Sequence, residues 1–218
     1  LANLPETIPA KFVDQQCGSA MAAIQIGFME IAQDFADVVM VGGYEHMTRI
    51  PMGGYTTERG LIKPNMTLFL YPSHQHWDMM NAMNMGMTAE KLFSQTDLSK
   101  EDLDRWAVRS HQLAAKFQKE GFFDGEIMPI EAPQDDGTVM TVKMDQAVRG
   151  DTTLEGIAGL RPAFKKDGVI TAGNSSPLNA GASSMMLMSK ETAKKKGIKP
   201  LATIRSIGFA GVDPTIMG

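Results

Sequence analysis

The chain contains a single cysteine, Cys17, between the segment Lys11–Gln16 and a long run of small and apolar residues. We expect a short strand over Lys11–Gln16 and a helix that begins at the cysteine. Unpaired backbone N–H groups and the positive end of the helix dipole would then favour the thiolate, which is the nucleophilic form of the side chain. A lone cysteine can equally be a small buried hydrophobic residue. Cys17 is therefore a candidate nucleophile, and the rest of the chain has to decide between the two interpretations.

The four histidines are the other side chains that could move protons near neutral pH. His46 directly follows an expected strand and is the first candidate for a base, although a local hydrogen bond is the commoner role there. His111 falls on the polar side of an expected helix and should lie at the surface. His74 and His76 have no cluster of cysteines or carboxylates beside them to complete a ligand set, so we predict no metal site.

Composition excludes several classes of protein. The 218 residues, 43% hydrophobic and 21% charged, are ordinary for a soluble globular protein of one large domain or two small ones. A formal net charge of −4 argues against nucleic acid as a partner. No apolar run is long enough to cross a bilayer. One cysteine excludes an internal disulfide and suits a reducing compartment, so we expect a cytoplasmic protein, with an organelle matrix left open. The chain does not begin with methionine, which suggests the middle of a longer protein.

The segment around Cys17 predicts its own supporting elements. From Cys17 to Met29 there is no charged residue, and apolar residues recur at helical spacing. A helix that is apolar on nearly all sides is expected to be buried on all sides. Asp37–Gly43 is typical of a parallel strand covered on both faces. Together with Lys11–Gln16 these elements would form a right-handed βαβ unit, with Cys17 at the carboxyl end of its first strand.

The remaining elements follow from local patterns. Residues 50–84 have weak periodicity and resemble a long excursion from a core. Ser99 and Asp102 form a capping box for an amphipathic helix that ends at Gly121. We further expect a hairpin from 127–130 and 139–142, a helix start after 173–176, a strand over 185–188, a helix over 191–196 and a last strand over 202–207.

Four stretches together resemble the thiolase superfamily, and within it the degradative 3-ketoacyl-CoA thiolases. They match in order and spacing along nearly the whole chain. The stretches are Val13–Ser19, similar to the nucleophile segment; Val41–Met47, similar to the strand end that follows it; Met85–Glu90 with Arg109–Gln112, similar to the inserted loop domain; and Thr171–Ser176 with Asp213–Gly218, similar to the return into the core.

The resemblance implies an α/β fold: a partial thiolase-type layered αβα core from residues 1–49 and 172–218, with an inserted α+β, CoA-binding loop domain from residues 50–171. Members of the family begin earlier and continue for a further C-terminal domain. That domain carries a Gly-His-Pro histidine that acts as general base and a second cysteine that acts as acid and base. Neither occurs here, so the resemblance implies an internal piece that is inactive by itself.

The resemblance also implies an activity, that of an acetyl-CoA C-acyltransferase of fatty acid metabolism. Cys17 would be the acyl acceptor in thiolytic cleavage of 3-ketoacyl-CoA, or in the reverse Claisen condensation, and its backbone N–H one oxyanion-hole donor. Glu45 would support the cysteine loop, unless it is only a turn residue. Coenzyme A would be a substrate and no cofactor would be permanently bound.

The positions that the resemblance assigns to CoA are Met85, Arg149, Ala163, Phe164, Ala172, Ser176, Leu178 and Met217. Phe164 with its alanine and leucine neighbours would form an apolar slot for pantetheine, and the Ser176 hydroxyl would bind an amide. Arg149 would lie beside the adenine and phosphate end. The ordinary alternatives are core packing for Phe164 and Leu178, and a solvated surface charge for Arg149.

Other interpretations stay open from the sequence. A condensing enzyme of the ketoacyl-synthase or hydroxymethylglutaryl-CoA synthase type would share the fold and nucleophile, and an inactive thiolase-fold binding subunit would share the fold alone. The family also implies a homodimer or homotetramer built across the strand before Cys17. The chain departs from the family at Asn84, where some members carry a pocket histidine, and at Pro177 and Ala180.

Overall fold

The computed structural model of the chain describes residues 3–47, 55–56, 62–63 and 70–218. The chain divides into two compact units. The first consists of Leu1–Pro64 with Leu178–Gly211, and the second of Asn65–Pro177 with Val212–Gly218. The limits expected for the core and for the inserted domain stay predictions.

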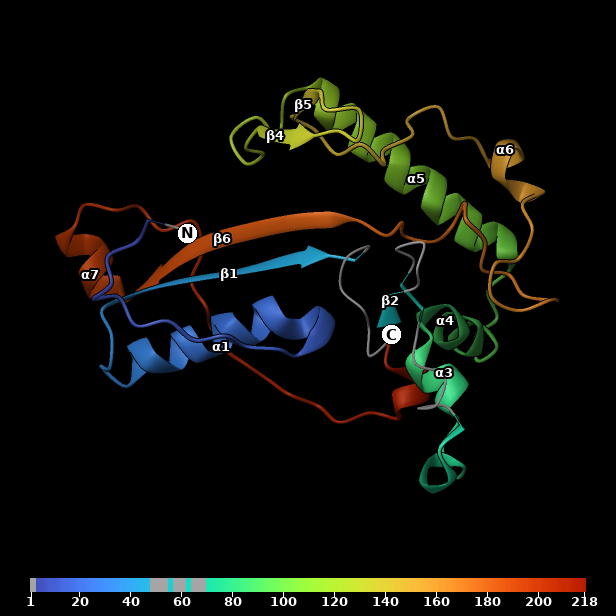
Figure 1. Ribbon diagram of the computed structural model, residues 1–218, viewed down its shortest axis with the longest axis horizontal. Helices are drawn as coiled ribbons and strands as arrows, with labels where there is room; N and C mark the ends of the chain where they lie inside the picture. Colours follow the sequence, from blue (N-terminus) through green and yellow to red (C-terminus); the bar gives the residue numbers. More distant parts are fainter. Residues whose placement is uncertain (1–2, 48–54, 57–61, 64–69) are drawn as a thin grey trace. The chain divides into compact units, whose positions relative to one another are not determined.

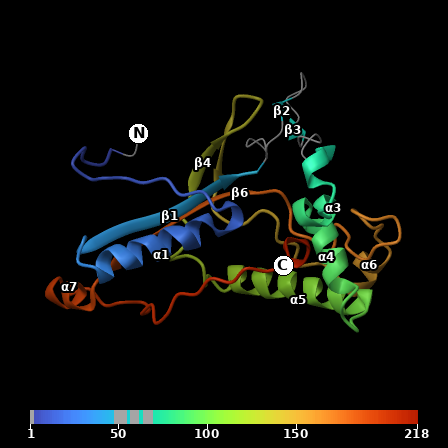
Figure 2. The ribbon, with the colours of Figure 1, turned by 90° about the horizontal axis from the view of Figure 1, so that it is seen from below.

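The first unit is built on two long strands and one helix. Strand β1 (Val38–His46) pairs antiparallel with β6 (Ala180–Met188) along its whole length. Helix α1 (Ser19–Ala32) runs beside this pair, as Figures 1 and 2 both show. The helix packs closely because Gly27 has no side chain, and an added Cβ there would lie 3.0 Å from Cγ1 of Val41. This close contact packs the N-terminal half of β1 against the helix.

The surroundings of α1 and β1 differ from those expected. Met21 is 66% exposed, so α1 is buried on one side only. Residues 11–15 form no strand, and the βαβ unit predicted from them is absent from the described part of the chain. The partner of β1 is antiparallel. An apolar run shows that a strand is covered but not which way its neighbour runs, because both directions bury the same side chains.

The structure after residue 176 also differs in part from the prediction. The expected helix start is instead the first half of β6, and residues 202–207 form no strand. The two strands approach closely at Gly42 of β1, where an added Cβ would lie 2.5 Å from the carbonyl oxygen of Ser183 in β6. The helix predicted over 191–196 is confirmed as α7 (Lys190–Lys195), which Gly197 follows with φ +67°.

The second unit is mostly helical. Its elements are η2 (Pro72–His74), α3 (Met79–Met83), α4 (Met85–Phe93), α5 (Lys100–Lys119), β4 (Ile130–Pro133), β5 (Val139–Val142), α6 (Leu154–Ala158) and η3 (Pro214–Ile216). The capping box of α5 is confirmed, because the N–H of Ser99 donates to Oδ2 of Asp102 at 2.8 Å. The hairpin is confirmed as β4 and β5, with Gly137 at φ +83° in its turn. In the first unit, a further short pair, β2 (Tyr55–Thr56) and β3 (Ile62–Lys63), is antiparallel.

Candidate active site

Cys17 lies in a tight turn that leads into α1. The turn is the short 3-10 element η1 (Gln16–Gly18), and the thiol is exposed. Gln16 has φ +52°, a left-handed conformation that is uncommon for a residue with a side chain and often occurs at functional sites. The exposed thiol excludes the interpretation of Cys17 as a buried hydrophobic residue within the described chain.

Neighbouring side chains hold this turn in place. Oδ1 of Asp14 accepts a hydrogen bond from the N–H of Gln16 at 2.9 Å. The hydroxyl of Ser19 accepts from the N–H of Gln15 at 2.8 Å and donates to the carbonyl of Gln16 at 2.6 Å. These bonds join residues before and after Cys17 and stabilise the turn, which offsets the cost of the left-handed conformation of Gln16.

Strand β1 contacts the start of α1 at Gly43. An added Cβ at Gly43 would lie only 2.8 Å from Cβ of Ala20, in the first turn of α1. At Gly18 the nearest atoms to an added Cβ belong to Gln15 and lie at 3.7 Å, which is ordinary contact. The helix and the strand therefore approach each other closely at Gly43, whereas Gly18 has only ordinary contacts. This contact could not be predicted, because a glycine pair in an apolar strand does not reveal which segment packs against it.

Glu45 and His46 lie at the end of β1. Oε1 of Glu45 accepts from the N–H of His46 at 2.8 Å, and the Glu45 side chain is exposed. This bond favours the local role for Glu45 over that of a support for the cysteine loop.

The predicted CoA-binding residues are distributed unequally between the two units. Leu178 belongs to the first unit, as Cys17 does, and its side chain is exposed. The other seven belong to the second unit: Met85, Arg149, Ala163, Phe164, Ala172, Ser176 and Met217.

Phe164 lies at the N-terminus of α4. An added Cβ at Gly86 would overlap the Phe164 ring, so the ring rests directly on the helix backbone beside Met85. The ring remains 43% exposed and is therefore not ordinary core. A backbone bond of 2.8 Å from Ala163 to Ile170 and the bridge between residues 162 and 171 place Ala172 on the neighbouring strand-like segment. The structure thus places Phe164 against the start of α4, and Ala163 and Ala172 on two paired backbone segments.

Asn84 caps α4 at this same point. Its Oδ1 accepts from the N–H groups of Gly86 at 3.0 Å and Met87 at 3.2 Å. A side chain committed to the helix N-terminus fixes the backbone on which Phe164 rests. The departure from the family at residue 84 therefore has a structural role here.

Two buried carboxylates hold the segment that contains Ala172 and Ser176. Glu90 of α4 accepts from the N–H groups of Val169 and Ile170, both at 2.9 Å. Asp104 of α5, which pairs with Lys100, accepts from the side-chain amide of Asn174 at 2.9 Å. Neither carboxylate can be recognised from the sequence, because an acidic residue on the polar side of a helix looks the same whether it faces water or a buried loop.

The two serines that follow Asn174 differ in exposure. The Asn174 side chain also accepts from the N–H of Thr171 at 2.8 Å, closing the turn that presents the next residues. Oγ of Ser175 is buried, and no hydrogen-bond partner for it occurs among the described residues. Ser176 is exposed, as a residue that binds a substrate amide needs to be.

Arg149 is also exposed, in an irregular segment between β5 and α6. Its N–H donates to Nδ1 of His111 on α5 at 3.2 Å. His111 is half-buried, so it is less exposed than a residue on the outer face of the helix would be. The contact joins residues far apart in sequence, and the helical pattern alone could not show it.

Met217 follows η3, which packs against α3 and α4. Asp213 caps this short element: the hydroxyl and the N–H of Thr215 donate to its carboxylate and hold the Asp213 pKa below the ordinary value. The ammonium of Lys91 on α4 donates to the Thr215 hydroxyl. These contacts fix Met217 close to the end of α4.

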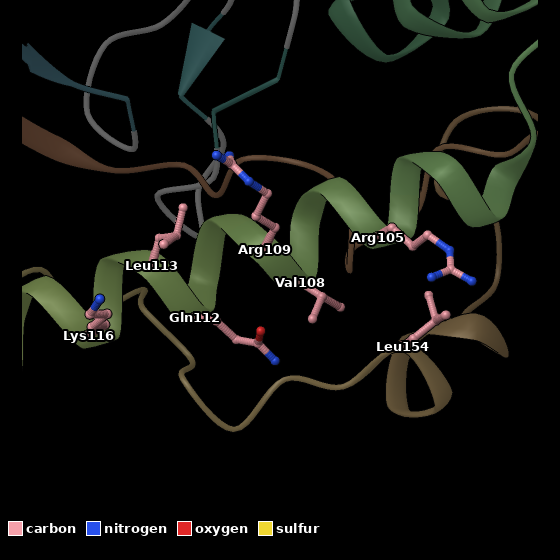
Figure 3. A pocket seen from close by; sticks show the side chains of 7 residues that line it. All are labelled: Arg105, Val108, Arg109, Gln112, Leu113, Lys116 and Leu154. Atoms are coloured by element: carbon pink, nitrogen blue, oxygen red, sulfur yellow. The ribbon is translucent and has the colours of Figure 1, made fainter.

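A groove of about 520 Å³ runs along α5 (Figure 3). It is lined by Arg105, Val108, Arg109, Gln112, Leu113, Lys116 and Leu154. The Arg109 guanidinium lies 4.9 Å from the ring centre of Trp106, and Arg105 pairs with Glu101. None of the predicted CoA residues lines this groove.

Within residues 3–47 and 70–218, no three histidine, cysteine, aspartate or glutamate side chains gather as a metal site would require. No helix in the described ranges is long and apolar enough to span a bilayer.

Comparison with known proteins defines the class. Residues 1–191 match the family described as "Thiolase, N-terminal domain". The chain therefore belongs to the thiolase family, and its α/β fold is that of a thiolase domain.

Particular relatives are similar along the same range. A probable acetyl-CoA acyltransferase of Staphylococcus aureus is 41% identical over 99% of this chain and 55% of its own length. The acetyl-CoA acetyltransferase of Bacillus anthracis has a TM-score of 0.80 at 39% identity, over 98% of this chain and 54% of that one. Human mitochondrial 3-ketoacyl-CoA thiolase has a TM-score of 0.74 at 33% identity, over 91% and 50%. The chain thus spans about half the length of the relatives it matches.

Proposed function

We propose that the protein containing this chain is an acyltransferase that cleaves 3-ketoacyl-CoA by thiolysis through an acyl-thioester on Cys17. The observation that carries the proposal is the exposed sole cysteine in a braced turn at the start of α1, in a chain of the thiolase family. Such shortening of acyl-CoA would place the enzyme in fatty acid metabolism.

The chemistry assigned to Cys17 proceeds in two steps. The thiolate attacks the keto carbon C3 of 3-ketoacyl-CoA, the C2–C3 bond breaks, and C2 takes a proton to leave as acetyl-CoA. The acyl group then passes from Sγ to the sulfur of a second CoA, whose proton is removed. We assign these proton transfers to the histidine and second cysteine that thiolases carry outside the range spanned here, so the isolated chain should not turn over.

We further propose that CoA binds where Phe164 lies on α4. The half-exposed ring and the two alanines offer an apolar surface for pantetheine, and the exposed Ser176 hydroxyl can bond its amide. The exposed Arg149 provides a positive charge for the nucleotide end. The resemblance to thiolases assigns Leu178 and Met217 to CoA as well.

The experiment that tests the proposal is acylation of Cys17 in the full-length enzyme. Incubation with acetoacetyl-CoA, without free CoA, should add one acetyl group to the Cys17 peptide in a mass spectrum. Cys17→Ala should fold normally, carry no acetyl group and lose at least about a thousandfold in turnover. Thiolysis by that variant within tenfold of the wild type would reject the assignment. Turnover by the isolated chain would show that it contains a base, with His46 the first to be substituted.

Assembly is a separate part of the proposal. We propose a homodimer or homotetramer in which residues 11–16 face a second copy. Support comes from Phe12, whose large apolar side chain is 79% exposed beside the nucleophile turn. Phe12→Ser in the full-length enzyme should shift sedimentation toward monomer and lower activity in parallel. A fully active monomer would contradict this arrangement.

A further inference from the structure

The backbone around Arg149 is fastened to one face of α5. The N–H of Arg149 donates to Nδ1 of His111 at 3.2 Å. One turn further along α5, an added Cβ at Gly150 would lie 2.5 Å from Cβ of Ala115. The segment that contains Arg149 and Gly150 therefore lies directly against the helix. The segment therefore takes its position from α5, because it forms no helix or strand of its own.

A second side chain of α5 holds the end of the same segment. Gln112 donates to the carbonyl of Thr152 at 3.3 Å. Figure 3 shows its side chain extending from α5 toward the irregular segment that leads to Leu154. The N–H of Thr152 in turn donates to the carbonyl of Arg149 at 3.1 Å. Arg149 thus sits at the start of a closed turn with both of its backbone polar groups bonded, while its guanidinium is left exposed.

We propose that His111 is a positioning residue for the nucleotide half of CoA. By accepting the N–H of Arg149, His111 fixes the point from which the guanidinium reaches the phosphates. This inference rests on the proposed function. The bond needs a lone pair on Nδ1, so the role requires an acceptor at that place and not the histidine ring itself.

Because the proposed role needs only a hydrogen-bond acceptor at residue 111, substitutions with and without an acceptor test it directly. In the full-length enzyme, His111→Ala should raise the KM for CoA roughly three- to tenfold, the range that one hydrogen bond to the backbone contributes, with kcat within about twofold. His111→Asn places an amide oxygen near the position of Nδ1 and should restore most of the affinity. Gln118→Ala is the matched control, because Gln118 bonds a loop carbonyl, that of Asp145, from the same helix at 3.3 Å.

A truncated substrate separates positioning from general damage. Pantetheine lacks the nucleotide, so its KM should be the same for His111→Ala and the wild type. In an Arg149→Ala background, His111→Ala should add no further rise in the KM for CoA. An equal rise for pantetheine and CoA, or an undiminished rise in the Arg149→Ala background, would overturn the proposal.

Two further measurements keep the test decisive. Should His111→Ala fail to fold, Gly150→Ala lifts the same segment from α5 and must show the same split between CoA and pantetheine. Failure of the proposed function itself gives a different result, since the wild-type enzyme would then carry no acetyl group on Cys17.

Discussion

Replacing Gly43 by alanine tests whether the contact between β1 and the first turn of α1 sets the position of Cys17. The added Cβ would lie 2.8 Å from Cβ of Ala20, whereas carbon atoms in contact normally stay about 3.5–4.0 Å apart. Strand and helix must therefore separate by about 1 Å. Because Ala20 follows the nucleophile by three residues, the thiol moves with it.

The magnitudes of the two expected effects differ. Overpacking of this kind costs about 1–3 kcal/mol of stability, which leaves the enzyme folded. A displacement of about 1 Å at a reacting group can cost about 10²-fold in rate. We therefore expect Gly43→Ala to lose about a hundredfold in kcat for thiolysis of acetoacetyl-CoA while its melting temperature falls only modestly.

The matched control lies on the facing strand. Gly181 is in β6, pairs with Glu45, and has no atom within 4 Å of an added Cβ. Gly181→Ala should keep wild-type kcat and acylation of Cys17. If Gly43→Ala were as active as Gly181→Ala, the contact would have no part in placing the thiol and the reasoning would be refuted.

Three more changes follow from the second unit. Gly86→Ala displaces the Phe164 ring and should raise the KM for CoA several-fold, whereas Gly125→Ala, which enters open space, should not; equal values would exclude the ring from the site. Ser99→Ala removes the cap of α5 and should cost about 1 kcal/mol in urea unfolding, and an unchanged midpoint would contradict the cap's role. Hydrogen bonds from Ser99 lower the pKa of Asp102 below 3.8, so the stability it adds is present above that pH and is lost as the pH falls through the folded value. The variant Asp102→Asn should lack this acid-dependent loss, measured as the difference in unfolding midpoint from wild type between pH 5 and pH 2, and an identical pH profile would refute the assignment.

Local signals in the sequence predicted several elements correctly. The capping box at Ser99, the glycine after α5 and the hairpin turn at Gly137 are each formed by residues close together in the chain. Helix α1 was recognised for the same reason, since its apolar spacing is local. The sequence resemblance also identified the family, which the match over residues 1–191 confirms.

Strand neighbours were beyond such signals. Neither the strand expected over Lys11–Gln16 nor the one over residues 202–207 has a partner strand in the described chain, and residues 11–15 and 202–207 are irregular. A strand exists only through its partner, and an apolar pattern does not name that partner. The direction of β6 beside β1 was missed for this reason.

By itself, the sequence determined which residue can be the nucleophile, which family the chain belongs to, and, to within a residue or two, where α5 and α7 begin and end. Only the tertiary structure decided which contacts hold the candidate site residues. These are the close contact of Gly43 with Ala20, the hydrogen bonds of Glu90 and Asp104 to the segment before Ser176, and the hydrogen bond between His111 and Arg149. The physical reason is sequence distance. A cap or a turn is settled by neighbours within a few residues, whereas a buried carboxylate or a close approach depends on a chain segment many residues away that only folding brings near.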